Sequence, residues 1–234
     1  MARDIVLDTE TTGMDPLKGD RIIEIGAVEL INLMPTGRTC QIYINPERDI
    51  PADATAVHGI TDEFVKDKPI FSQCYMEFMD FIADDSTLVI HNAEFDMKFL
   101  NWELQHVGHK PIGWKRVVDT LMMARKKFPG SPANLDALCR RFEIDNTSRT
   151  YHGALLDSEL LAEVYLELLG GRQRGLELGA DAASKSAIGK SAAKKDRKFR
   201  DPRPHTASET ELAAHKELLE DLTDPIWDKV KHTS

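Results

Sequence analysis

The 234-residue sequence contains only three cysteines, which are Cys40, Cys74 and Cys139. They are far apart, odd in number and without the CxxC spacing of a zinc site, so a disulfide framework and a structural zinc are both disfavoured. The sequence also lacks any apolar run near the ~18 residues that a membrane span requires. The first apolar run ends at Asp8, which is too early for a signal peptide. We therefore expect a cytoplasmic protein with free thiols that does not enter a membrane.

Basic residues are scarce for a protein that would coat a nucleic acid. The chain has 30 Lys and Arg against 39 Asp and Glu, a formal net charge of −9 and a pI near 5.4. A general nucleic-acid coat carries a basic face, so this balance disfavours one. Apolar residues make up 41% and charged residues 29%, which is ordinary for a globular protein and excludes disorder of the whole chain.

Composition changes along the chain and predicts three parts. Residues 1–170 are patterned as one domain. Residues 171–205 are rich in Ala, Ser, Gly and Lys, and we interpret them as a flexible linker because such a segment buries too little apolar surface to fold. In residues 206–234, Ser208 and Glu211 form a capping box before an amphipathic helix. A lone helix of this length is marginal in water, so we expect it to dock on an external partner rather than on its own domain.

Strand and helix signals alternate through residues 1–170. Strands are predicted at 5–7, 21–33, 41–44, 88–90 and from 117, and helices at 71–82, 94–106, 121–127, 135–142 and 155–169. Turn signals between the first three strands, including Pro35-Thr36-Gly37, predict an antiparallel meander. The later strands alternate with helices, so we predict an α/β fold whose mixed sheet continues with parallel strands and carries helices on its faces.

Two acids follow the first apolar run. Asp8 and Glu10 are separated by one residue, and residues i and i+2 of a strand point to the same face. Both carboxylates therefore project from the carboxyl end of a buried strand, where ligands bind in open α/β sheets. Two acids on an apolar element are costly unless a cation neutralises them. A solvated strand end explains this pair, taken alone, about equally well.

Two further acids lie where helices begin. Asp96 is in the first turn after the strand 88–90. Glu94 can complement the dipole of that helix, which leaves Asp96 available for a ligand. Asp157 opens the last long helix, and His152 converges with it only if His152 lies on the incoming loop, with a bend at Gly153.

The combination of these side chains predicts a metal site. Carboxylate oxygens without clustered Cys or His select hard cations such as Mg²⁺ or Mn²⁺. Four carboxylates exceed what one Mg²⁺ usually takes, and two ions ~3.5–4 Å apart suit in-line displacement at a phosphodiester. His152, which titrates near neutral pH, is the candidate base for the attacking water. Bound metals would also supply the positive charge that an acidic protein needs to hold a phosphodiester.

Three motifs appear in order: Asp8-Thr9-Glu10-Thr11-Thr12-Gly13, His91-Asn92-Ala93-Glu94-Phe95-Asp96 and His152-Gly153-Ala154-Leu155-Leu156-Asp157. Over about residues 3–170 they resemble the motifs of the DEDDh 3′→5′ exonucleases. Within that group the chain is similar to the proofreading, epsilon-type subunits of bacterial DNA polymerase III. The resemblance implies a ribonuclease H-like fold. It also implies a metal-dependent exonuclease that hydrolyses phosphodiester bonds at a single-stranded or frayed 3′ end of DNA, releases nucleoside 5′-monophosphates and so proofreads replication.

The resemblance implies roles for individual residues. Asp8, Glu10 and Asp157 would ligate the first metal ion, and Asp8 would bridge to the second. Asp96 would act mainly through bound water, and His152 would be the general base. The residues in contact with the terminal nucleotide would be Asp8, Thr9, Glu10, Thr12, Val57, His58, Phe95, His152 and Asp157. For Val57 and Phe95, plain core packing is the alternative.

The resemblance extends more loosely into the tail. Within residues 173–178, Gln173, Leu176 and Leu178 are similar to the anchors of short peptides that dock in the bacterial sliding clamp. Residues 206–234 would bind the polymerase III catalytic subunit, in a core that also holds a small accessory subunit. The polymerase-binding side chains would be Leu212, Leu218, Leu219, Leu222 and Trp227, of which Trp is a residue type that often carries interface energy.

Two other functions stay open at this point. The same chemistry serves relatives that trim RNA 3′ ends. From another class, the chain could be an adaptor that tethers polymerase to clamp with little catalysis of its own. Four acids and a histidine in this order argue against an inert adaptor, because such a protein has no use for them.

Overall fold

The computed structural model describes residues 2–147, 149, 151–171 and 206–220. The chain divides into two units between residues 178 and 179, and the first of them, called the domain below, and the C-terminal helix are each described by themselves. Predictions for the linker, for the clamp-binding residues Gln173, Leu176 and Leu178, and for Leu222 and Trp227 lie outside the described residues.

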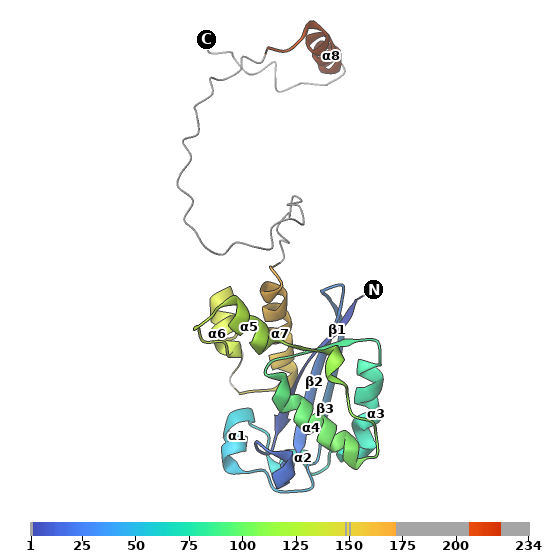
Figure 1. Ribbon diagram of the computed structural model, residues 1–234, viewed down its shortest axis with the longest axis vertical. Helices are drawn as coiled ribbons and strands as arrows, with labels where there is room; N and C mark the ends of the chain where they lie inside the picture. The colour runs from blue at the N-terminus through green and yellow to red at the C-terminus, as the bar shows by residue number, and fades with distance from the viewer. Residues whose placement is uncertain (1, 148, 150, 172–205, 221–234) are drawn as a thin grey trace, which may run out of the picture. The chain divides into compact units, whose positions relative to one another are not determined.

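A mixed five-stranded sheet runs through the domain in the order β3-β2-β1-β4-β5 (Figure 1). The strands are β1 (Arg3–Thr11), β2 (Ile22–Ile31), β3 (Met34–Tyr43), β4 (Thr87–Ile90) and β5 (Val117–Asp119). The first three pair antiparallel, β4 pairs parallel with β1, and β5 pairs parallel with β4. The predicted sheet, with three antiparallel strands followed by parallel ones, is confirmed.

Helices cover both faces of this sheet. On one face, Ile5 and Leu7 of β1 share a core with α3 (Phe71–Ile82) and α4 (Ala93–His106). On the other, Val6 shares a core with α5 (Thr120–Lys127), α6 (Leu135–Phe142) and α7 (Ala154–Leu168). Successive residues of β1 thus enter opposite layers, as strand geometry requires. Apolar periodicity predicted α3 and α6 with these bounds, and the other three to within one or two residues.

The hairpin between β2 and β3 differs from the prediction. The turn is made by Asn32 and Leu33, which have φ angles of 51° and 67°, and not by Pro35-Thr36-Gly37, which lies inside β3. A two-residue turn with both φ angles positive matches the twist of the strands it joins. β3 also begins seven residues earlier than predicted. It is an edge strand, so it tolerates a proline and polar, exposed side chains that hide it from an apolar pattern.

Two short helices were missed, α1 (Ala52–His58) and α2 (Asp62–Val65), as were the 3₁₀ turns η1 (Pro16–Lys18) and η2 (Trp114–Arg116). None of them is long enough to show an apolar period. α1 ends at Gly59, whose φ of 72° is left-handed, and α2 begins where the Thr61 hydroxyl accepts a hydrogen bond from Phe64 N at 3.3 Å.

The three cysteines are buried free thiols, as predicted. Among the helices of the described residues, none combines the length and the apolar character that crossing a membrane demands.

The C-terminal helix α8 spans Glu209–Glu220. Its predicted capping box is confirmed, because Ser208 N donates to Glu211 Oε2 at 2.8 Å and Glu211 N donates to Ser208 Oγ at 3.3 Å. Leu212 and Leu218 are each 57% exposed, whereas Leu219 is half-buried, so two of the three predicted leucines that the structure describes are exposed.

Candidate active site

Asp8 and Glu10 lie in the last part of β1. The expectation that the strand breaks at Asp8 is wrong, since β1 continues to Thr11. The reason is backbone pairing with β2, which places Asp8 opposite Gly26 and Glu10 opposite Glu24. Asp8 is partly exposed, whereas Glu10 is only 9% exposed. Both carboxylates project from the same face of the strand, as predicted.

Asp96 is held against β1 by a side-chain hydrogen bond. It lies in the first turn of α4, is 2% exposed, and accepts from the Thr9 hydroxyl at 2.7 Å. The start of α4 is satisfied by Asp119, whose carboxylate accepts from Asn92 N and Ala93 N, both at 3.3 Å. Asp119 therefore caps this helix, and Asp96 is not needed for that role.

Asp157 and His152 meet at the start of α7. Asp157 lies in the first turn and is 4% exposed. His152 lies in the preceding loop, where its backbone N–H donates to the backbone carbonyl of Val57 at 3.1 Å. Its Nδ1 is 3.5 Å from Asp157 Oδ2. Gly153 has φ −141° and ψ 126°, ordinary extended backbone, so the bend expected there does not depend on glycine.

Burial and neighbouring carboxylates raise the pKa values of three of these acids, Asp8, Glu10 and Asp96. Burial raises the pKa of Asp8 well above its usual value, and Asp96, Glu10 and Asp157 raise it further. Burial, Asp157 and Glu24 raise the pKa of Glu10 to about 8, and burial raises that of Asp96 to about 7. One ligand atom each from Glu10, His152 and Asp157 lie within 4.8 Å of one another.

This cluster fits a divalent cation. Mutual repulsion among buried carboxylates opposes their ionisation, and a cation relieves it. The donor set is oxygen with a single imidazole, which favours hard ions. The structure thus brings together Asp8, Glu10, Asp96 and Asp157 with His152 beside them, from three distant segments of the chain.

The raised pKa values predict a pH dependence of stability in chelator. An unfolded carboxyl titrates near ~4, whereas Glu10 in the folded protein titrates near 8. Between these values the folded state binds more protons than the unfolded state, so the free energy of unfolding falls as pH rises. We expect the difference in Tm between Glu10→Gln and wild type, measured in EDTA, to grow in favour of the variant from pH 5 to pH 8. A constant difference would contradict the assigned electrostatics.

Glu24 and Gly26 of β2 position α7, and the sequence analysis missed both. Glu24 is 1% exposed, and its carboxylate accepts from Ala154 N at 3.1 Å and from Gln41 Nε2 at 2.8 Å. α7 touches Gly26 so closely that a Cβ there would lie 2.1 Å from the Ala154 carbonyl carbon. The available signal was an acid, Glu24, between apolar residues of a predicted strand.

Arg149 was also missed. Its side chain is 8% exposed and forms an ion pair with Asp157. Nothing in its sequence neighbourhood marks an isolated arginine as part of a site, so only the folded structure reveals it.

The other predicted substrate-binding residues have differing environments. Thr12 is buried and closes the β1–β2 connection, since its hydroxyl accepts from Arg21 N at 3.0 Å. Val57 is 48% exposed. His58 is buried, its Nδ1 accepts from Ile60 N at 3.0 Å, and among the described residues its Nε2 has no partner. Phe95 is half-buried, with its ring centroid 5.0 Å from that of Phe99.

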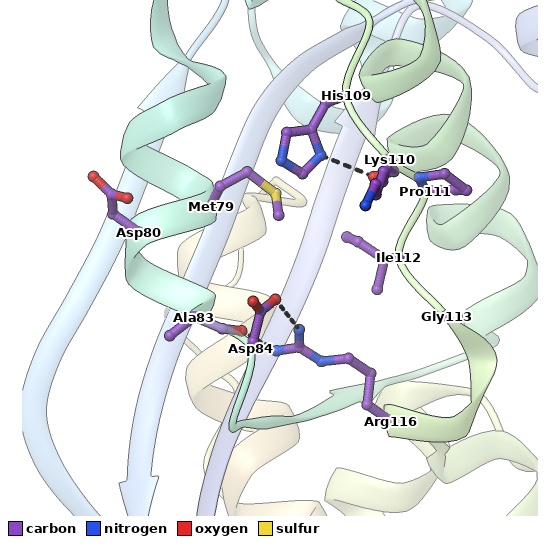
Figure 2. A pocket seen from close by; sticks show the side chains of 10 residues that line it. All are labelled: Met79, Asp80, Ala83, Asp84, His109, Lys110, Pro111, Ile112, Gly113 and Arg116. Atoms are coloured by element: carbon purple, nitrogen blue, oxygen red, sulfur yellow. Dashed lines mark hydrogen bonds and ion pairs between the residues drawn. The ribbon is translucent and has the colours of Figure 1, made fainter.

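A separate hollow of about 600 Å³ lies between the end of α3 and the loop that leads to η2 (Figure 2). Arg116 lines it and donates to Ser86 O at 3.0 Å and Ile82 O at 3.1 Å. Its lining residues precede β4 and β5, at the opposite end of the parallel strands from Asp96. None of the predicted site residues lines this hollow.

Comparison with known proteins gives consistent matches. An exonuclease family model of the RNase T type matches residues 5–165. The DNA polymerase III subunit epsilon of Rickettsia felis is 56% identical over 179 residues, which cover 75% of this chain and 78% of that protein. The protein of the same name from Salmonella typhimurium is 45% identical over 228 residues, which cover 94% of this chain and 93% of that protein.

Solved structures agree on the fold. Exonuclease X in complex with 5′ overhanging duplex DNA superimposes with a TM-score of 0.55 at 26% identity, covering 72% of this chain and 91% of that one. The nuclease domain of 3′hExo, a DEDDh family member bound to rAMP, superimposes with a TM-score of 0.62 at 22% identity. The match covers 71% of this chain and 91% of that one. The predicted ribonuclease H-like fold is confirmed. The chain belongs to the epsilon-subunit family of bacterial DNA polymerase III, the 3′→5′ proofreading exonucleases.

Proposed function

We propose that this chain removes mispaired nucleotides from a single-stranded or frayed 3′ end of DNA, and releases nucleoside 5′-monophosphates. The observation that carries the proposal is the convergence of four acids, three of them at most 9% exposed, beside one accessible histidine. An acidic cluster of this kind has a purpose only when cations occupy it. A protein that takes part in bacterial DNA replication would act in the cytoplasm, and we propose that location for this chain.

We infer that two divalent ions, Mg²⁺ or Mn²⁺, are the cofactors. Asp8, Glu10 and Asp157 would hold the first ion, Asp8 would also reach the second, and Asp96 would act mainly through water. When bound, such ions offset the charge of a phosphodiester and lower the pKa of a bound water. Thr9 supports this set by fixing Asp96 through the 2.7 Å hydrogen bond.

His152 is the proposed general base. Its side chain is 47% exposed, so water and substrate can reach it. The hydrogen bond from the backbone N–H of His152 to the backbone carbonyl of Val57 holds the loop in place. Val57 and His58 belong to the same neighbourhood, because burial and the nearby His152 lower the pKa of His58. The free Nε2 of His58 and the exposed Val57 are therefore suited to contact the sugar or base. We assign Phe95 and the turn held by Thr12 to the same nucleotide site.

Digestion of matched oligonucleotides tests the proposal directly. With Mg²⁺, a mispaired DNA 3′ end should be shortened faster than a paired one, and both faster than an RNA 3′ end of the same sequence. EDTA should stop all three reactions. Preference for the RNA end would favour an RNA-trimming enzyme, and the absence of any digestion would favour an adaptor.

We propose that the tail connects the nuclease to the replicase. Residues 206–234 would bind the polymerase catalytic subunit, and 173–178 would bind the sliding clamp, with a small accessory subunit completing the core. The support is α8, whose Leu212 and Leu218 are exposed, and the name that the relatives carry.

Deleting residues 206–234 should abolish co-elution with the polymerase subunit and leave nuclease activity on single-stranded DNA within about twofold of the full chain, because the four acids and His152 all belong to the first 170 residues. Gel filtration of the mixed proteins and the digestion assay measure the two effects. The full-length Lys216→Ala variant, altered on the same helix, serves as control. Persistent co-elution of the truncated chain would show that the polymerase binds elsewhere.

A further inference from the structure

Arg149 joins three groups at the edge of the candidate active site. Its Nε donates to Asp157 Oδ1 at 2.5 Å and its Nη2 to Oδ2 at 2.6 Å, so the guanidinium engages both carboxylate oxygens. Its Nη1 donates to Asp136 Oδ1 at 2.7 Å. The side chains of Arg149 and Asp157 are 8% and 5% exposed. A bidentate pair shielded in this way from water holds its geometry firmly.

Arg149 also decides which nitrogen of His152 carries the proton. Its Nη2 lies 2.8 Å from His152 Nδ1. A guanidinium only donates, so Nδ1 accepts, and the single proton of the neutral imidazole is then on Nε2. In this arrangement neither ring nitrogen is free to take a proton from water. His152 can therefore act as the proposed base only after Arg149 moves away from it.

We propose that Arg149 is the counter-cation of the metal-free site, which holds Asp157 and His152 in place and gives up Asp157 when a divalent ion binds. The inference rests on the proposed role of Asp157 as a metal ligand. A guanidinium on both oxygens of Asp157 repels a dication at the same carboxylate. The Arg149 guanidinium and a divalent ion therefore each weaken the binding of the other to Asp157.

Asp136 provides a second carboxylate with which Arg149 stays paired when it leaves Asp157. Its side chain is 48% exposed, and it already accepts from Arg149 and, at 3.1 Å, from Asn146 Nδ2. Arg149 can thus leave Asp157 without becoming an unpaired buried charge. Its withdrawal also releases His152 Nδ1, which lies 3.5 Å from Asp157 Oδ2. Nδ1 can then carry the proton and leave Nε2 as the base.

Binding of Mn²⁺ alone, measured by calorimetry on the full chain, tests this inference without reference to activity. Arg149→Ala should bind Mn²⁺ on the order of tenfold more tightly than wild type, because one competing ion pair is lost. In EDTA its Tm should fall by about 5–10 °C, and saturating Mn²⁺ should narrow that gap. Arg140→Ala removes the same charge from an exposed position on α6 and should change neither quantity. Equal or weaker Mn²⁺ binding by Arg149→Ala overturns the inference.

Two further measurements keep the test decisive. If Arg149→Ala does not fold, Arg149→Gln keeps most of the volume and should show the same tighter binding. In the wild-type protein, the NMR signal of the Arg149 Nε–H should move during Mg²⁺ titration, and a signal that stays unchanged at saturation overturns the inference.

Asp157→Asn separates this inference from the proposed function. Weaker Mn²⁺ binding by Asp157→Asn, without tighter binding by Arg149→Ala, would overturn only the role of Arg149. Unchanged binding by Asp157→Asn would remove the proposed ligand, and the inference with it.

Discussion

Asp8→Asn should eliminate Mg²⁺-dependent release of nucleotides and, in chelator, make the protein more stable. Asp8 is the acid proposed to reach both ions, and a metal supplies several kcal/mol of transition-state stabilisation. We therefore expect the rate to fall by about a thousandfold or more. The gain in stability has a different cause. Burial and three neighbouring acids raise the pKa of Asp8, so replacing its carboxylate with a neutral amide removes repulsion.

The two effects are measured by digestion of a single-stranded oligonucleotide and by thermal unfolding in EDTA. Asp85→Asn is the matched control, since the Asp85 side chain is 79% exposed and lies before β4. That variant should match wild type in both assays. Asp8→Asn retaining more than about one hundredth of wild-type activity would mean that Asp8 is not a metal ligand.

Gly26→Ala should be the most damaging substitution that touches no charged group. A Cβ at Gly26 would lie 2.1 Å from both the Ala154 carbonyl carbon and Leu155 N, which are backbone atoms that no rotamer change can move aside. α7 must shift away from β2, with loss of the bond from Ser158 Oγ to Gly26 O at 2.9 Å. We expect a loss of at least about 3 kcal/mol in the free energy of unfolding.

The same shift displaces Asp157, which α7 carries. A misplacement of about 1 Å can cost a hundredfold in rate, so any folded Gly26→Ala should also lose activity. Urea unfolding and the digestion assay measure the two losses. Gly113→Ala is the control, because Gly113 has φ −80° and nothing lies within 4 Å of its added Cβ. A stable, active Gly26→Ala would show that α7 can pack on β2 at a greater distance.

Much of the fold could be predicted because its signals are local. The periods of apolar residues predicted α3 and α6 to the residue, and the capping box before α8 depends on Ser208 and Glu211 alone. The predicted position of the β2–β3 turn was wrong for a physical reason. Pro35-Thr36-Gly37 has turn-forming composition, but pairing of Ile31 with Met34 places the turn between them. Pairing energy along a whole hairpin outweighs the preference of three residues.

The candidate site divides in the same way. Its acids and His152 could be identified from motifs, since each motif is a short run of neighbouring residues. Their supports could not. Glu24 caps α7 from 130 residues away, and Gly26 matters only because α7 crosses it.

The sequence by itself determined which residue types are available for metal chemistry and the order of strands and helices that carry them. Only the tertiary structure decided that Arg149 engages Asp157, and that Glu24 and Gly26 set the position of α7. The reason is that periodicity and capping act within a few residues, whereas these contacts exist only after the sheet has brought distant segments together. A lone arginine or glycine has no pattern of its own until that happens.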